Sequence, residues 1–309
     1  MIVVFSLLSA PLDLAKSLSE PTSDGVIVVS YCAKQLAECA PLKSLAPVVS
    51  EYLQLNAGAN NTASLIVVDK SVVPSGRLVY SGTGPVTRDQ DDVRRFSTAA
   101  RNAMKLALSA GMKSPILVTV PHQKYPQAEL VAALGALHEL HIPLNVREES
   151  EQKTKLSALA LLPVSYEASK FLRLVQTIEA AFTVCRDIGD ADPQRMSPPK
   201  VAEYVEEIFR GGCVKVRVTS DAKEIEREYP LMIAVNRASM GIEAHRPRLI
   251  ALEYIPEGPI EETIMLVGKG NGRRPYCSSQ LPNSSAGLHG QMAQLKNHYS
   301  RMKYLNYYL

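Results

Sequence analysis

With 309 residues the chain is long enough for two domains, and an apolar fraction of 46% with 6% aromatic residues is typical of a folded α/β protein. The formal net charge of +3 comes from residues 271–309, which hold five Lys or Arg and no Asp or Glu, so residues 1–270 carry about −2. This balance argues against a nucleic-acid-binding surface on the main body. No apolar run approaches the ~18 residues that a membrane span needs, which argues against an integral membrane protein.

The cysteines and the N-terminal run indicate a reducing compartment. Five cysteines make an odd number and form no Cys-x-x-Cys pair, which argues against a disulfide framework and against a zinc knuckle. The apolar run from Met1 to Leu8 has no Lys or Arg before it, so it does not match a secretory signal. We therefore expect a cytoplasmic protein.

Residues 1–162 alternate strand and helix, which predicts an N-terminal α/β domain with a mixed sheet. Two prolines, Pro41 and Pro47, divide the helical pattern of Ala33–Leu55 into two short helices. The turn at Pro74–Gly76 makes the strands on either side of it an antiparallel pair. The expected strands are Ile2–Phe5, Gly25–Ser30, Ala63–Asp69, Arg77–Tyr80 and Pro115–Val120, and the longer helices are Asp91–Ala110 and Gln127–Leu140. The first of these helices has an apolar stripe at spacings of three and four, and Gly111 can close it; the stripe consists of Val93, Phe96, Ala100, Ala103, Met104 and Ala107.

A long connector helix and a second α/β unit follow. Residues 163–190 are expected to form the connector, with an apolar stripe on the helix Ser165–Asp187 made by Phe171, Leu174, Val175, Ile178 and Phe182. From residue 191 the pattern is again α/β: Ser197 and Pro198 are typical of a helix start, and the helix should run to Phe209. The remaining expected elements are the strands Cys213–Val218 and Arg248–Tyr254 and the helix Asp221–Glu228.

Two local motifs suggest ligand sites but have simpler explanations. The glycine-rich turn Ser81–Pro85 follows a strand, yet Asp91 and Asp92 open the next helix and would repel a phosphate there. His138 and His141 are three residues apart at a helix end, whereas the zinc helix motif needs a spacing of four. We interpret the histidines as solvent-side residues, and keep a small-ligand or nucleotide site at Gly82–Gly84 as a minor alternative.

The candidate site residue is Lys269. The stretch Thr263–Gly270 has the pattern of a short buried strand through Val267, after which Gly268 and Gly270 allow tight turns on both sides of the lysine. The next 39 residues supply no carboxylate, and we expect this tail to be unrelated to the preceding domain and disordered. A metal site at Lys269 would therefore lack its anionic partners.

Three segments taken together resemble the leucyl (cytosol) aminopeptidase family of metallopeptidases. The first, Cys185–Glu203, is similar to that family's Arg-Asp-Leu-x-Asn-x-Pro segment, Thr-Pro and helix. The second joins Leu231–Ser239 to Arg246–Tyr254, where the family has a Gly- and Ser-containing turn, Pro-Arg and a strand ending in Glu-Tyr. The third, Leu266–Gly270, contains the family's Val-Gly-Lys-Gly. The resemblance covers about residues 165–270, which makes residues 191–270 the N-terminal portion of the catalytic domain.

The resemblance implies a two-metal hydrolase that removes N-terminal residues from peptides, uses zinc or manganese, and works as a hexamer in the cytoplasm. Two dications need several carboxylates to hold them and to activate a water. Lys269 matches the family lysine that ligates one metal. No other metal-ligating residue can be carried over, because Asn271–Arg274 stand where the family has a ligating Asp.

Other departures indicate a divergent, aminopeptidase-like branch. Asp190 replaces the family's Asn, and Arg237 stands where a small residue is usual. We therefore expect a family member truncated after Gly270 that has no complete catalytic set, binds no metal pair and is inactive alone. The alternative is a non-catalytic partner that assembles with full-length aminopeptidase subunits through the α/β domain, as a homo- or hetero-oligomer.

Overall fold

The computed structural model describes residues 8–151, 153–237, 241–270 and 305–308. The chain divides into two compact units, Met1–Gly189 and Asp190–Leu309, called unit 1 and unit 2 below. The expected strand Ile2–Phe5 lies outside the described residues.

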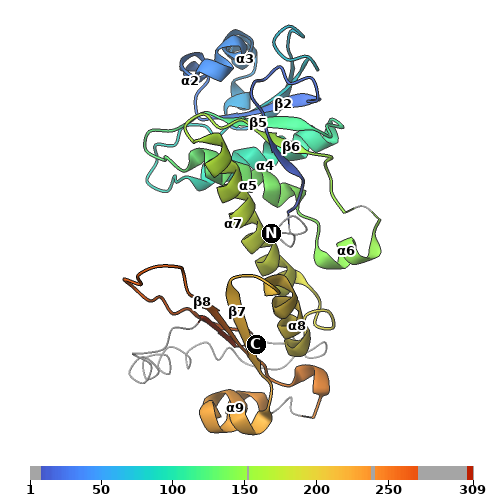
Figure 1. Cartoon of the computed structure of the whole chain (residues 1–309). Coiled ribbons are helices and arrows are strands. Elements are labelled where there is room, and N and C mark those ends of the chain that lie inside the picture. The colour runs from blue at the N-terminus through green and yellow to red at the C-terminus, as the bar shows by residue number, and fades with distance from the viewer. Residues whose placement is uncertain (1–7, 152, 238–240, 271–304, 309) are drawn as a thin grey trace. The chain divides into compact units, whose positions relative to one another are not determined.

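Unit 1 contains a six-stranded sheet in the order β1-β6-β5-β2-β4-β3 (Figure 1). All neighbouring pairs are parallel except β3 with β4, so the predicted mixed sheet and its antiparallel pair are confirmed. The short edge strand β1 and its partner β6 were not predicted. The strands are β1 Leu12–Leu14, β2 Gly25–Ser30, β3 Ala63–Val67, β4 Arg77–Gly82, β5 Pro115–Thr119 and β6 Leu159–Leu161.

Helices cover both faces of this sheet, which explains why β2 and β5 are continuous apolar runs and are buried along their full lengths. One core lies under α4, α5 and α7, and the other lies under α2, η1 and α3 (Figure 1). The helical pattern of Ala33–Leu55 is broken as predicted, but into three segments instead of two, because the 3-10 helix η1 lies between α2 and α3. The elements are α2 Lys34–Glu38, η1 Ala40–Leu45, α3 Ala46–Leu55, η2 Ala57–Asn60, α4 Arg94–Ser109, α5 Ala128–Leu140, α6 Leu144–Glu149 and α7 Ala168–Asp190.

The helix predicted from Asp91 begins three residues later, at Arg94. Asp91 is buried before the helix and pairs with Arg88 and Arg95 at 3.0 and 2.8 Å. The predicted apolar stripe on α4 is confirmed at Phe96, at Met104 and at three alanines, and Gly111, whose φ is 75°, follows two residues after the helix end at Ser109.

Close packing between α4 and α5 depends on Gly135. A Cβ at this position would lie 2.6 Å from the backbone oxygen of Ser97 and 2.7 Å from its Cα. We expect Gly135→Ala to lower the free energy of unfolding by about 1–3 kcal/mol through overpacking. Gly189→Ala is the matched control, because a Cβ at that helical glycine would meet no atom of another part of the chain within 4 Å, and alanine should stabilise the helix by about 0.5–1 kcal/mol. Urea unfolding that ranks the two variants alike would contradict this account.

The expected apolar stripe of α7 is only partly correct. Phe171 and Val175 are buried, but Leu174 and Phe182 are 39% and 43% exposed. Toward its C-terminal end the helix buries polar side chains instead, namely Glu179, Thr183 and Asp187. The apolar spacing alone therefore located the first half of the buried face and missed the second.

Unit 2 has a four-stranded sheet in the order β7-β8-β10-β9, with β7 and β8 antiparallel. The predicted helix after Ser197 is confirmed as α8, although the Ser197 side chain makes no capping hydrogen bond. Asp221 does cap α9, by accepting from the Lys223 backbone N–H at 3.1 Å. The elements are α8 Pro198–Phe209, β7 Val214–Thr219, α9 Ala222–Glu228, α10 Pro230–Asn236, η4 Glu243–His245, β8 Leu249–Tyr254, β9 Val267–Lys269 and β10 Leu305–Tyr308.

Within the tail, residues 305–308 form β10, which pairs with β8 and β9. At these four residues the structure has a strand where the sequence pattern predicts disorder. Residues 271–304 and 309 lie outside the described ranges. In the part of the chain that the structure describes, no helix is long and apolar enough to cross a membrane.

Candidate functional site

Lys269, the candidate metal ligand, is the last residue of β9 and pairs in register with Tyr308 of β10. The expected buried strand from Ile264 to Val267 is wrong. Ile264 is 77% exposed, Leu266 is 59% exposed, and strand pairing begins only at Val267. The apolar run was mistaken for a buried strand because its composition does not reveal whether neighbouring chain covers it.

Carboxylates do not gather around a metal position in the described ranges of the chain, where no group of three or more His, Cys, Asp or Glu could hold an ion. In the same sheet Glu253 lies on β8, in register with Lys215 of β7. Glu261 and Glu262 precede β9 and are exposed. A two-metal centre needs several anionic ligands, so these described residues do not fit such a centre.

The glycine-rich turn after β4 is used for packing. A Cβ on Gly82 would lie 2.1 Å from the backbone oxygen of Asn60, and Gly84 has a φ of +66°. The Thr83 and Gly84 N–H groups donate to backbone oxygens of Ser30 and Asn60 at 2.9 and 2.8 Å. These glycines therefore serve a close chain approach, and their N–H groups are not free to cradle a phosphate.

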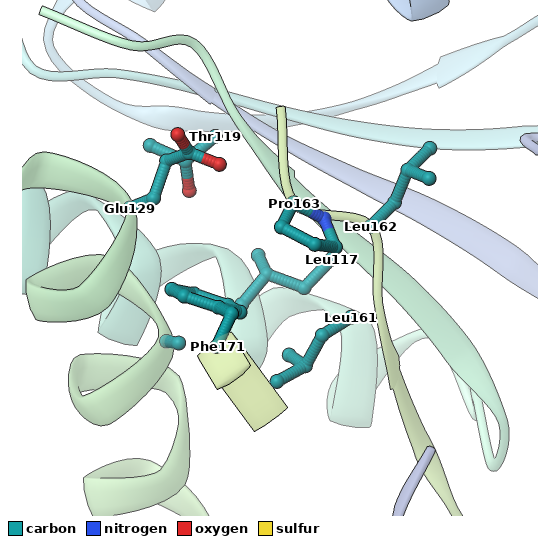
Figure 2. A pocket seen from close by; sticks show the side chains of 8 residues that line it. Leu117, Thr119, Glu129, Leu161, Leu162, Pro163 and Phe171 are labelled. Atoms are coloured by element: carbon teal, nitrogen blue, oxygen red, sulfur yellow. The ribbon is translucent and has the colours of Figure 1, made fainter. Parts of the chain in front are cut away.

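A small cavity lies in unit 1, whereas Lys269 belongs to unit 2. Its volume is about 10 Å³, roughly the space for one water molecule. Figure 2 shows the polar groups of Glu129 and Thr119 among mostly apolar lining residues, including Leu117, Leu161 and Phe171. Glu129 accepts from the Val164 and Ser165 backbone N–H groups at 2.7 and 3.0 Å, which ties α5 to the chain after β6. This carboxylate has a structural role.

Sequence reasoning missed a buried polar cluster on α7. Glu179 is fully buried and accepts from Ser9 Oγ at 2.5 Å and from Arg186 Nη1 at 2.9 Å. Farther along the same helix, Arg147 of α6 donates to the buried carboxylate of Asp187. Burial raises the pKa of Glu179, against the opposing effects of Ser9 and Arg186.

His141, which we interpreted as a solvent-side residue, belongs to this neighbourhood. It is only partly exposed, and burial, followed by the charge of Arg186, lowers its pKa to about 4. His138 is exposed, as predicted. The interpretation is therefore wrong for His141, because charged residues of α6 and of α7, the latter distant in the sequence, lie near enough to act on its imidazole.

A search for any residue type at every fourth position could have located the buried face of α7, because the buried side chains of this helix recur with that spacing. The series Phe171, Val175, Glu179, Thr183, Asp187 is buried throughout. Only its first two members are apolar, so a search for apolar residues loses the pattern at Glu179.

The comparisons with solved structures define the class of fold. A tomato leucine aminopeptidase mutant aligns with a TM-score of 0.61 at 13% identity, covering 84% of this chain and 54% of that chain. The bottromycin maturation enzyme BotP in complex with Mn aligns with a TM-score of 0.58 at 16% identity, covering 81% of this chain and 48% of that chain. The fold is thus the α/β fold of the leucine aminopeptidases.

Comparisons of the amino-acid sequence identify the protein family. The model of the cytosol aminopeptidase family, catalytic domain, matches residues 183–271. A Caenorhabditis elegans protein named "Putative aminopeptidase" is 49% identical over 269 residues, covering 86% of this chain and 51% of the relative. A "Probable cytosol aminopeptidase" of Aeropyrum pernix is 31% identical over 196 residues, covering 63% of this chain and 36% of that relative. The chain belongs to the cytosol aminopeptidase family, and it spans about half the length of the first of these relatives.

Proposed function

We propose that this chain carries the N-terminal α/β domain and the first portion, residues 191–270, of the catalytic domain of a two-metal aminopeptidase. The observation that carries the proposal is the Val-Gly-Lys-Gly motif, which stands inside the segment that matches the catalytic domain. The reaction class is the removal of N-terminal residues from peptides. Zinc or manganese is the proposed metal of the complete site, and the cytoplasm is the proposed compartment.

Lys269 occupies the ligand position of this site in the proposal. A lysine amine binds a metal only after losing its proton, which the ion itself promotes, and carboxylates are needed beside it to hold that ion. Residues 271–309 contain no Asp or Glu. The 309-residue chain thus supplies a single proposed ligand, and we assign no catalytic step to it alone.

We expect the purified 309-residue chain to release no product from a leucyl chromogenic substrate in the presence of Mn²⁺ or Zn²⁺. The rate should equal that of the Lys269→Ala variant, because one amine without anions cannot hold two dications. Chromogen release would be followed by absorbance, with metal-free buffer as background. A rate clearly above that of the variant, at equal protein concentration, would refute this inactivity.

A second candidate function is a non-catalytic subunit that assembles with full-length aminopeptidase chains. Unit 1 favours this candidate, because two helix layers cover its sheet and give it two hydrophobic cores of its own. Unit 2 also exposes large apolar side chains, including Leu231, Val235 and Ile264. Co-expression of a tagged chain with a full-length relative tests it: recovery of a defined hetero-oligomer supports the subunit role, and separate elution of the two chains excludes it.

A further inference from the structure

In the sheet of unit 1, the connections leave the neighbouring strands β2 and β5 toward opposite edges of the sheet. After β2 the chain moves toward β3 and β4, whereas after β5 it moves to the opposite side, toward β6. Because β2 and β5 are parallel neighbours, their carboxyl ends open side by side at this place. In open α/β sheets such a switch point is where ligands bind, outside the carboxyl ends of the strands.

Aromatic rings occupy this place, which we call the ring corner: Tyr31, Phe96, His122 and Tyr125. Tyr31 directly follows β2, and His122 comes three residues after β5. The His122 ring centroid lies 4.4 Å from that of Tyr31, 5.8 Å from that of Phe96 and 5.1 Å from that of Tyr125. Phe96 is fully buried and its ring contacts those of Tyr31 and His122, whereas the other three residues are partly exposed. The rings thus form a supported aromatic surface with an accessible side.

The ring corner also presents polar groups that its own contacts leave available. His122 Nδ1 accepts from the Lys124 backbone N–H at 3.2 Å, which places the imidazole proton on Nε2. Among the described residues neither His122 Nε2 nor the Tyr31 hydroxyl has a hydrogen-bond partner, and neither is a buried unpaired atom. Both groups are therefore open to solvent. Tyr125 is already committed, since its hydroxyl donates to the Asp91 backbone oxygen at 3.0 Å.

The backbone N–H and guanidinium groups beside the ring corner are not available to a phosphate, although the exposed Lys124 places its Nζ 5.3 Å from the Tyr125 ring centroid. The N–H groups of the nearby glycine turn are hydrogen-bonded to Ser30 and Asn60. Arg95 is also occupied, because it pairs with Asp91 and donates to the Thr83 backbone oxygen at 2.9 Å. A ligand here would be held by ring contacts and by donation from His122 Nε2–H, and it needs an acceptor atom in the plane of its ring.

We infer that the ring corner of unit 1 is a binding site for a planar nitrogen heterocycle of the purine type, recognised through its ring and not through a phosphate. This site is independent of Lys269 and of the proposed peptidase function. It differs from the phosphate loop that the glycine-rich turn suggested, because it uses the residues after β2 and β5 in place of the turn after β4.

Titration of the full chain with adenosine tests the inference. In ¹³C spectra of histidine-labelled protein, the His122 ring signal should shift and saturate with a dissociation constant of about 1 mM or below, a typical range for a small ligand with few contacts. Phenylalaninamide offers a ring without an in-plane acceptor, and we expect it to bind about fivefold more weakly or worse, as loss of one hydrogen bond predicts. Inorganic phosphate should neither shift the signal nor compete.

Conservative variants keep the fold and remove single recognition groups. We expect His122→Phe, which keeps a ring but lacks Nε2–H, to weaken adenosine binding about fivefold in titration calorimetry, and Tyr31→Phe to weaken it about threefold, as loss of one hydrogen bond predicts. Tyr254→Ala removes an exposed tyrosine of unit 2 and should leave binding unchanged. The inference is overturned if His122 shows no saturable shift, if both ring-corner variants bind like the parent chain, or if phosphate displaces adenosine.

Discussion

Replacing Arg186 by alanine is expected to lower the free energy of unfolding of unit 1 by about 3 kcal/mol at about pH 7.5, since breaking a buried ion pair leaves its partner's charge uncompensated. The side chain of Glu179 is fully buried, and that of Arg186 is 14% exposed. Among the described residues, the second carboxylate oxygen of Glu179 already has no hydrogen-bond partner. Removal of the guanidinium would leave a charged, buried carboxylate with the Ser9 hydroxyl as its donor.

The loss of unfolding free energy caused by Arg186→Ala should become smaller as the pH falls. Burial raises the pKa of Glu179, and Arg186 acts in the opposite direction, so the alanine variant should have a still higher pKa at this carboxyl. The stabilisation of unit 1 by Arg186 is therefore fully present above the folded-state pKa values of Glu179 in the parent chain and the variant. It is lost as the pH falls through these values, because a protonated Glu179 has no charge for a cation to balance.

Urea unfolding at about pH 7.5 and about pH 5, on either side of the expected titration, measures both effects, and hydrogen exchange in β2 and β5 assigns them to unit 1. Arg173→Ala is the matched control, because Arg173 is an exposed residue of the same helix and its loss should change the unfolding free energy by less than about 0.5 kcal/mol. Equal losses in the two variants, or a loss at Arg186 that does not depend on pH, would contradict the role assigned to this pair.

Unit 1 is also expected to lose on the order of 1 kcal/mol of stability between about pH 7 and about pH 5 through His141, whose partial exposure to solvent screens the effect. Its folded pKa is lowered from 6.5 to about 4 by burial and by Arg186. In this pH range the unfolded chain binds a proton at His141 and the folded chain does not. Stability from this residue is hence present above pH 6.5 and is lost as the pH falls toward 4.

The variant His141→Gln cannot titrate and should remove this part of the pH dependence. His138→Gln, at the exposed histidine three residues earlier, serves as the control and should keep the parent profile. The measurement is the difference in unfolding free energy between about pH 7 and about pH 5 for each protein. If His141→Gln keeps the full loss, its imidazole is not the group that titrates.

Local patterns and long-range partners account for different parts of this protein. The strands β2 and β5 and the apolar face of α4 were predicted because an apolar run or a helical spacing identifies such elements without knowledge of their neighbours. The family was likewise predictable, since its motifs are short and stand in order along the chain. The candidate ligand Lys269 was proposed from one of these motifs.

Other features depend on residues that are distant in the sequence. Glu179 is stabilised in its buried position because Ser9 and Arg186 donate to it, and the pKa of His141 is lowered by burial and by the charge of Arg186 on α7. The exposure of Ile264 and Leu266 also depends on what covers them and not on their own side chains. Amino-acid pattern alone thus determined the longer helices, the central strands and the family, whereas the short strands β1 and β6, the burial of charge and the ring corner came from tertiary contacts, because desolvation and pairing are set by neighbours that no local pattern contains.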